Sequence, residues 1–250
     1  MSDTKKNIQE LDVVTIRFAG DSGDGMQLTG NQFSDNTALF GNDLSTLPDF
    51  PAEIRAPAGS LAGVSSFQLQ FSHKDVHTPG DSVDVLVAMN PAALKVHLQD
   101  LKENGMLLAN TANYTKKNLG LAGFEENPLE NDSLSKYRLI KVDMTGVVFK
   151  ALEGMGLTSK IMSRSTNMFA LGLLYWLYER DMQSTINFLE KKFKSKPEII
   201  EANTKALKAG FYFGDTIEAI KTTYRISKAH FKKGVYRNIM GNPALSMGLL

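Results

Sequence analysis

The sequence contains no cysteine among its 250 residues. Without thiols the chain forms no disulfide, uses no cysteine nucleophile and ligates no iron–sulfur cluster through cysteine. It also has few long apolar runs, and the run at residues 168–178 holds only eleven residues. A membrane-spanning helix needs about 20 apolar residues. We therefore expect a buried helix at 168–178, and no contact with a membrane.

Neither sign of charge is in large excess, because 28 Lys and Arg stand against 27 Asp and Glu, for a net charge of +1. This balance predicts no general affinity for nucleic acid or for membrane surfaces. Charge is uneven along the chain, since residues 190–237 hold twelve Lys or Arg and five Asp or Glu. Two interpretations stay open there, a solvated helical face followed by a basic linker, or an anion site.

The N-terminus is polar and has no apolar core of the secretory kind, so we expect a cytoplasmic protein. The four histidines do not have the spacing of metal ligands, except for the pair His73 and His77 beside Asp75. An exposed polar turn explains that pair, and the sequence therefore predicts no metal site.

Apolar runs separated by turn residues predict an α/β fold. Strands are expected at residues 13–18, 83–89, 105–110 and 139–142, and alternation at 64–71 predicts a further, half-buried strand. Helices are expected to begin near Gly25 and at Pro91, and the pattern after Gly154 is helical. We predict an open, mostly parallel, Rossmann-like sheet flanked by helices, with a helical C-terminal portion. The turns after residues 13–18 and 83–89 should share one edge of this sheet.

A glycine turn, Gly20-x-x-Gly23-x-Gly25, follows the first of these strands. It differs from the dinucleotide fingerprint, which would need glycine at Leu28, and it lacks the lysine of a Walker loop. A thiamine motif would use Asp24 and a later asparagine to hold magnesium, and residues 50–58 contain no asparagine. Two interpretations remain: backbone N–H groups that bind a ligand, or a tight turn built for backbone shape alone.

A second unusual segment is residues 48–60, which hold three prolines and a glycine. These residues oppose regular structure, so we expect a long loop with Glu53 and Arg55 exposed on it. Loops of this length inside a compact domain are often functional.

Four motifs together resemble the alpha subunit of 2-oxoacid:ferredoxin oxidoreductases, most closely the 2-oxoglutarate type. They are RFAGDSGDG at 17–25, PAEIRAPAGSLAGVS at 51–65, TPGD at 78–81 and RSTNM at 164–168. The resemblance covers roughly residues 12–250 and implies the gamma domain, an α/β module that helps to form the coenzyme A site. It also implies that thiamine diphosphate, magnesium and the [4Fe–4S] cluster belong to a separate beta subunit.

The resemblance implies oxidative decarboxylation of 2-oxoglutarate or a related 2-oxoacid to an acyl-CoA, with electrons passing through the complex to ferredoxin. In this interpretation the coenzyme A phosphates approach the glycine turn, Asn90 and Arg164, while the Glu53/Arg55 loop closes toward the beta subunit. The predicted cofactor-binding residues are Gly20, Asp21, Ser22, Gly23, Asp24, Gly25, Asn90 and Arg164. The alternatives are a surface cap for Arg164 and an intersubunit salt bridge for Arg55. No catalytic residue is assigned.

The domain organisation follows from the same comparison. We expect a polar tail at 1–12, the gamma domain at 13–220, a linker at 221–237, and at 238–250 the start of a truncated pyrimidine-binding domain. A truncated subunit should have no oxidoreductase activity in isolation. A non-catalytic α/β binding or assembly module is the alternative function.

Overall fold

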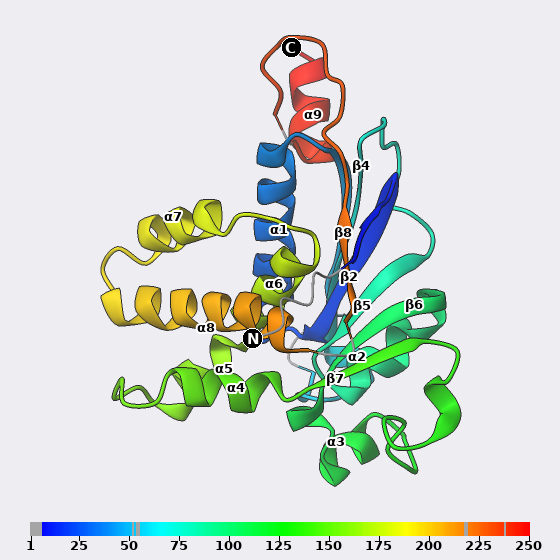
Figure 1. Ribbon diagram of the computed structural model, residues 1–250, viewed down its shortest axis with the longest axis vertical. Coiled ribbons are helices and arrows are strands. Elements are labelled where there is room, and N and C mark those ends of the chain that lie inside the picture. Colours follow the sequence, from blue (N-terminus) through cyan, green and yellow to red (C-terminus); the bar gives the residue numbers. More distant parts are fainter. Residues whose placement is uncertain (1–6, 52, 54–55, 218–219, 238) are drawn as a thin grey trace.

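The computed structural model describes residues 7–51, 53, 56–217, 220–237 and 239–250. Its centre is a six-stranded sheet in the order β3-β4-β2-β5-β6-β7 (Figure 1). The strands are β2 (Val13–Asp21), β3 (Asp43–Asp49), β4 (Val64–Ser72), β5 (Val83–Ala88), β6 (Leu101–Asn110) and β7 (Arg138–Val142). Strands β2, β5, β6 and β7 are parallel, and β4 runs antiparallel to both β2 and β3. This confirms the predicted open, mostly parallel sheet.

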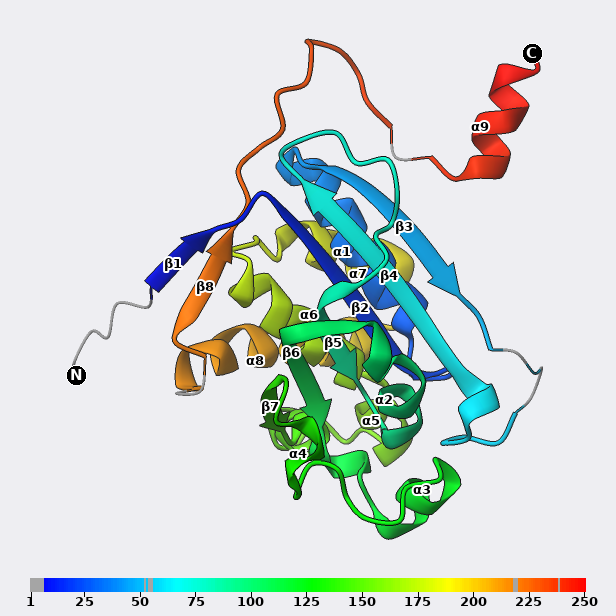
Figure 2. The ribbon, with the colours of Figure 1, turned by 90° about the vertical axis from the view of Figure 1, so that its right-hand side faces the viewer.

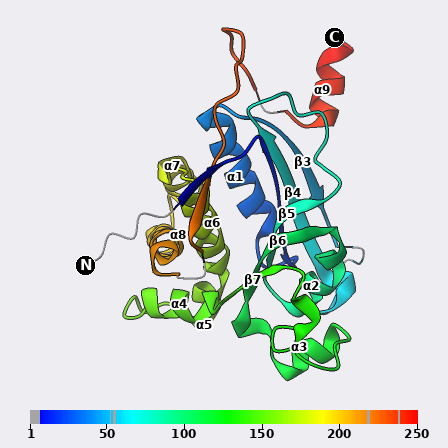
Figure 3. The same ribbon diagram turned by 45° about the vertical axis from the view of Figure 1, so that its right-hand side comes forward.

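Helices cover both faces of the sheet (Figure 3). One face packs on α1 (Met26–Phe40), α4 (Met144–Ala151), α6 (Thr166–Leu177) and α8 (Pro197–Thr216), whose apolar side chains share a core with Ile16, Phe18 and Val87. The other face packs on α2 (Pro91–His97), with Leu86 and Ala88 in its core. The remaining helices are α3 (Lys116–Leu121), α5 (Ser159–Arg164), α7 (Gln183–Lys192), α9 (Gly241–Gly248) and the short η1 (Leu61–Gly63), η2 (Leu98–Asp100), η3 (Thr111–Asn113) and η4 (Asp132–Leu134).

The central elements arise from the patterns that predicted them. Strand β5 is buried on both faces and lies between β2 and β6, so the three predicted neighbours are adjacent. Helix α1 begins directly after Gly25, and α2 begins with Pro91 after an Asn90 cap. All twelve residues of α6 are buried, which confirms the expected buried helix. The glycine turn and Asn90 therefore lie at the same edge of the sheet.

Strand β4 departs from the half-buried strand that alternation predicts, because eight of its nine residues are buried. Its polar side chains are covered by the segment that follows: the Gln68 side chain donates hydrogen bonds to the carbonyl oxygens of Pro79, at 2.7 Å, and Gly80. Hydrogen bonding of this kind lets a polar strand face be buried at small cost.

Strand β3 is a correction to the expected loop, which was predicted to start at Pro48. Pro48 and Asp49 instead complete β3, which pairs with β4 along its whole length. The strand lies at the edge of the sheet, where the missing N–H group of a proline is tolerated. Irregular backbone therefore begins after Asp49.

All three segments expected outside the gamma domain contain regular structure. Strand β1 (Asn7–Glu10), within the expected tail, pairs in parallel with β8 (Thr222–Arg225), within the expected linker. Ile226 is only 1% exposed. Beyond it, α9 stands away from the sheet and all its residues are exposed (Figure 2). The division into domains stays a prediction. Within the described part of the chain, no helix combines the length and apolarity that a bilayer crossing requires.

Helices α6 and α8 cross with their backbones in close approach. A Cβ atom built on Gly172 of α6 would lie 2.0 Å from the Leu207 carbonyl oxygen of α8. One built on Gly210 of α8 would lie 2.0 Å from the Phe169 carbonyl oxygen of α6. Glycine is required at both positions because any side chain would separate the two helices.

Candidate functional site

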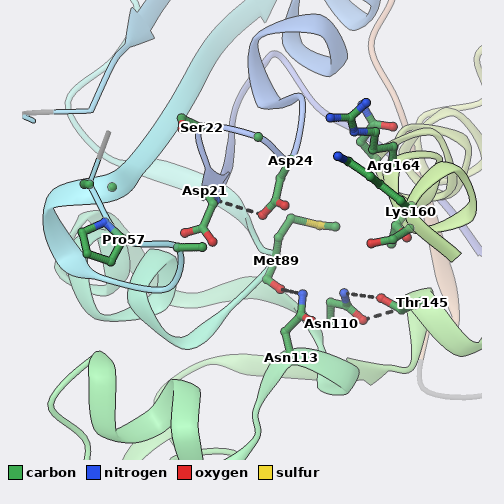
Figure 4. Close-up of a pocket in the computed structure, with 17 residues that line it drawn as sticks. Asp21, Ser22, Asp24, Pro57, Met89, Asn110, Asn113, Thr145, Lys160 and Arg164 are labelled. Carbon is green, nitrogen blue, oxygen red and sulfur yellow. Dashed lines mark hydrogen bonds between the residues drawn. The ribbon is translucent and has the colours of Figure 1, made fainter. Parts of the chain in front are cut away.

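A cavity of about 420 Å³ opens at the carboxyl ends of β2, β5 and β6 (Figure 4). In open α/β sheets this edge is where ligands bind. The cavity is lined by residues 21–24, Ala56, Pro57, Ala58, Gly63, Met89, Asn110, Asn113, Thr145, Lys160, Ser163, Arg164, Thr166 and Asn167. The predicted residues Asp21, Ser22, Gly23, Asp24 and Arg164 thus meet in one site.

The glycines of the turn have different roles. Gly25 has a φ of 76°, in the left-handed region that favours glycine, and a Cβ atom there would lie 2.4 Å from the Asn167 side chain. A Cβ atom on Gly20 would come within 2.8 Å of the Asp24 carboxylate. Gly23 has no atom within 4 Å of such a Cβ and no left-handed φ. A Cβ atom at Gly23 would therefore not obstruct the turn.

Three of the backbone N–H groups proposed as ligand donors already serve the turn itself. The Asp21 N–H donates to Asp24 Oδ2 at 2.9 Å, and the Asp24 N–H donates to the Asp21 carbonyl oxygen at 2.9 Å. The Ser22 N–H donates to the Gly63 carbonyl oxygen at 3.2 Å. These bonds fix the loop's shape, so side chains must supply most of the recognition of a ligand.

Two carboxyl groups form one side of the cavity. Burial raises the pKa of Asp24 to about 6, with the nearby Asp21 carboxylate adding to the increase and the hydrogen bond from the Asp21 N–H opposing it. Burial also raises the pKa of Asp21, against the opposing effects of the Gly59 N–H, which donates to Asp21 Oδ2 at 2.9 Å, and of the Asn90 side chain. The carboxyl side is therefore less negative than two free aspartates.

Two cations form the other side. Lys160 and Arg164 lie one turn apart on α5, and both side chains line the cavity (Figure 4). Neither makes an ion pair or hydrogen bond with any residue that the structure describes. Like charges four residues apart destabilise a helix. An anionic ligand would relieve that repulsion.

Helix α5 changes the expected position of Arg164 and adds Lys160 to the site. Ser163 and Arg164 were expected in a capping segment before the buried helix, yet they form the last turn of α5. The Ser165 side chain makes no capping bond to α6. Sequence reasoning missed Lys160, although its spacing of four from Arg164 places both residues on one helical face.

Buried polar atoms without partners also face this site. Asp21 Oδ1, Thr166 Oγ1 and Asn167 Oδ1 are buried and accept or donate no hydrogen bond within the described residues. An unsatisfied buried polar atom costs about 1–3 kcal/mol. Three such atoms belong to residues that line one cavity, so its walls are polar beneath their surface.

Asn90 and Asn110 both lie near the cavity and have different roles. Asn90 is 3% exposed, caps α2 by accepting from the Ala93 N–H at 2.8 Å, and does not line the cavity. Asn110, at the end of β6, does line it and holds Thr145 through a 3.0 Å bond to the Thr145 hydroxyl. Sequence reasoning missed Asn110, although Asn110 lies at the carboxyl end of a parallel strand, as the glycine turn does.

The proline-rich loop reaches the site through Ala56, Pro57 and Ala58. Glu53 is exposed and does not line the cavity. The prediction for Arg55 falls outside the described residues. The loop's contact with a partner subunit stays a prediction.

The fold and this cavity together define an α/β domain with a polar cavity at the carboxyl edge of its sheet. Residues 15–213 match the family described as pyruvate ferredoxin/flavodoxin oxidoreductase, and the chain belongs to that family. This agrees with the resemblance seen in its sequence motifs.

Two curated relatives are similar over most of this chain. The 2-oxoglutarate oxidoreductase subunit KorA of Mycobacterium tuberculosis (strain ATCC 25618 / H37Rv) is 54% identical over 242 residues, 97% of this chain. The ketoisovalerate oxidoreductase subunit VorA of Methanothermobacter marburgensis is 28% identical over 205 residues, 80% of this chain. The chain spans 37% and 36% of the lengths of these two relatives.

Solved structures share the fold. A 2-oxoglutarate:ferredoxin oxidoreductase from Magnetococcus marinus, with 2-oxoglutarate, coenzyme A and succinyl-CoA bound, superposes with a TM-score of 0.67 at 22% identity, over 88% of this chain and 34% of that one. The gamma subunit of a keto/oxoacid ferredoxin oxidoreductase from Geobacter sulfurreducens PCA gives a TM-score of 0.55 at 19% identity, over 82% of this chain and 99% of that one.

Proposed function

We propose that this chain is the gamma domain of a 2-oxoglutarate:ferredoxin oxidoreductase and that its cavity takes part in binding coenzyme A. The observation that carries the proposal is the pair of cations, Lys160 and Arg164, which line the cavity and form no ion pair within the described residues. The 54% identity to a 2-oxoglutarate oxidoreductase subunit supports the choice of 2-oxoacid. The coenzyme A in the M. marinus enzyme supports the choice of ligand.

The residues of the cavity suit the chemical groups of coenzyme A. Its phosphates would be held by Lys160 and by the planar guanidinium of Arg164, which can donate two parallel hydrogen bonds to one phosphate. The unsatisfied atoms of Asp21, Thr166 and Asn167 would pair with polar groups elsewhere in the same molecule. Asp24 lies across the cavity from the cations (Figure 4), and its raised pKa lessens repulsion of the phosphates.

In this proposal the chain binds and orients the acyl acceptor, and the oxidative chemistry belongs to partners. Thiamine diphosphate with magnesium would cleave the 2-oxoacid, and [4Fe–4S] clusters would carry electrons to ferredoxin. We assign these cofactors to a beta subunit, because this sequence has no cysteine with which to ligate a cluster. A cytoplasmic location is part of the same proposal.

The alternative, a non-catalytic binding or assembly module, makes a different prediction. Such a module would keep the fold and the contacts with partner subunits and would not depend on Lys160 or Arg164. Substitution of these two cations therefore distinguishes the two functions.

The test is coenzyme A binding by isothermal titration calorimetry and the steady-state kinetics of the reconstituted complex. Arg164→Ala should remove a charge-assisted hydrogen bond of about 1.5–3 kcal/mol, which is roughly a ten- to hundredfold loss of affinity for coenzyme A. Lys160→Ala should act in the same direction. The Michaelis constant for 2-oxoglutarate should stay within about twofold, because the cations do not contact the 2-oxoacid in this proposal.

Lys136→Ala is the matched control, since Lys136 is an exposed lysine far from the lining of the cavity. An unchanged Michaelis constant for coenzyme A in both the Arg164 and the Lys160 variants would refute the assignment of this cavity and favour the assembly module.

A further inference from the structure

A second feature, independent of the cavity, is a concentration of lysines on the hairpin formed by α7 and the first half of α8. We call residues 183–208 the basic hairpin. Residues 191–208 hold six lysines and two glutamates, in a chain whose net charge is +1. All six lysines are exposed. Figure 1 shows the turn of the hairpin pointing away from the central sheet.

Internal contacts account for little of this charge. Lys205 pairs with Glu201 at 2.9 Å, within one turn of α8. Lys192 lies over the Phe188 ring at 5.2 Å. Within the described residues the other lysines have no ion pair: Lys191, Lys194, Lys196 and Lys208.

The position of Lys196 is electrostatically unfavourable. Lys196 is the N-cap of α8, a helix of twenty residues, and no side chain caps that end. A helix N-terminus carries a partial positive charge and favours Ser, Thr, Asp or Asn as its cap. A lysine here costs stability. Departures from local preference of this kind are expected where a surface has a function.

An apolar groove lies between the two helices of the hairpin. Ile186, Pro197 and Ile200 line it, together with Thr204, the two lysines Lys205 and Lys208 and the two glutamates Glu190 and Glu201. The groove encloses about 580 Å³. A concave apolar surface with a charged border is the arrangement found at protein interfaces, where a buried anchor is surrounded by polar contacts.

We infer that the basic hairpin is a docking surface for an acidic protein partner, which inserts an apolar side chain between α7 and α8 and places carboxylates against the lysines. Charge complementarity favours a negatively charged partner and increases the rate of association. This inference does not rest on the coenzyme A site, since none of its residues lines that cavity.

Two other anionic surfaces fit the hairpin less well. A nucleic acid fits less well because the sequence pI of about 7.8 is below that of a typical nucleic-acid-binding domain. Helices that bind lipid surfaces project bulky apolar side chains. Residues 183–208 present no exposed large hydrophobic side chain, and Ile186 and Ile200 line the groove.

Fluorescence anisotropy with a labelled acidic peptide tests the inference. The probe is a synthetic peptide of glutamates with spaced leucines, and the protein is the full chain. Replacing four lysines of the turn by glutamine should weaken binding about tenfold or more, and raising the salt concentration should weaken binding to the unmodified chain. The substitutions are Lys191→Gln, Lys192→Gln, Lys194→Gln and Lys196→Gln.

The control neutralises four lysines elsewhere, and it should leave peptide binding within about twofold. Those substitutions are Lys116→Gln, Lys117→Gln, Lys136→Gln and Lys150→Gln. Ile200→Ser, in the groove, should weaken binding even though no charge changes. Equal losses in the two sets of lysine variants would overturn the inference. So would tighter binding to a DNA duplex, or to vesicles of phosphatidylserine and phosphatidylcholine, than to the peptide.

Discussion

Single residues in the cavity carry most of its electrostatic character. Lys160 and Arg164 form no ion pair within the described residues and line the cavity opposite the acidic pair Asp21 and Asp24. Because burial raises the pKa of Asp24 to about 6, this carboxyl group gains or loses its proton close to neutral pH. Stability and ligand binding should both depend on pH in this range.

For stability the direction follows from the raised pKa. Between pH 4 and 6 the folded state holds the Asp24 proton more tightly than the unfolded state, so stability falls as the pH rises through this window. Asp24→Asn, which cannot ionise, should gain roughly 1–3 kcal/mol over the unmodified chain between pH 4 and pH 7. Thermal unfolding at several pH values measures this. Asp81→Asn, the same change on an exposed loop, is the matched control. A pH-independent difference for Asp24→Asn would contradict the assignment.

The glycine turn gives a second contrast between neighbouring residues. Gly25→Ala should cost about 1–3 kcal/mol, since alanine disfavours the φ of 76° and its Cβ would meet Asn167. Gly23→Ala should be nearly neutral for folding, because its Cβ enters open space. Chemical denaturation of both variants distinguishes them. The explanation fails if the Gly23 variant is the less stable of the two.

Among the elements, the crossing of α6 and α8 is the most demanding in shape. The helices touch through backbone atoms at Gly172 and Gly210, so no side chain can adjust to relieve an added methyl group. The contact therefore depends on the smallest residue at both positions.

Gly210→Ala should destabilise the protein by about 3 kcal/mol or more, because the helices must separate. Gly120→Ala is the matched control, a helical glycine in α3 with no atom within 4 Å of an added Cβ. That change should stabilise by roughly 0.5–1 kcal/mol, through better helix propensity and a less flexible unfolded chain. Denaturant unfolding gives both values, and losses of similar size would show that packing at the crossing is not the cause.

Most elements of the fold were predictable, because apolar runs mark strands that are buried on both faces and Gly25 and Asn90 mark helix starts. Strand β3 was not, since its position at the edge lets it keep Pro48 and Asp49, residues typical of loops. Helix α5 was missed because it has only six residues and a sequence rich in serine and threonine around it. Short elements of this kind depend on tertiary packing more than on their own pattern.

Part of the candidate site was predictable from one rule of α/β topology. The carboxyl ends of parallel strands meet at one edge, and this rule brought together the glycine turn and Asn90, whereas Arg164 was predicted only from the family resemblance. The same rule applied to β6 would have found Asn110. The hydrogen bonds that occupy the Asp21, Ser22 and Asp24 amides could not be predicted, because their acceptors include Gly63, far away in the sequence.

For the molecule as a whole, the folded body extends beyond the predicted gamma domain. The pairing of β1 with β8 brings both segments against the body, and the Tyr224 hydroxyl accepts a hydrogen bond from Arg138 at 2.6 Å. The expected linker is therefore ordered as far as Ile226, which is buried. Residues after that point are mostly exposed.

Ile226→Ala should consequently cost about 2–5 kcal/mol, the usual range for a buried large-to-small change. Val235→Ala, in the same expected linker, should change stability by less than about 0.5 kcal/mol, because Val235 is fully exposed. Differential scanning calorimetry on the two variants measures the contrast. Equal small effects would mean that residues 221–237 behave as a linker throughout.

The glycine contacts of α6 also determine how the cavity can adapt to what it binds. Thr166 and Asn167 begin this helix and line the cavity, and further along the helix Gly172 is locked against the backbone of α8. The side of the cavity formed by the start of α6 is therefore expected to be rigid. The segment from Ala56 to Gly63 on the opposite side has no comparable restraint from a helix crossing, and Ala56, Pro57, Ala58 and Gly63 line the cavity. Adjustment to ligands of different length should therefore fall on residues 56–58, which precede the hydrogen bonds that tie Gly59 to Asp21 and Gly63 to Ser22, while α6 stays in register.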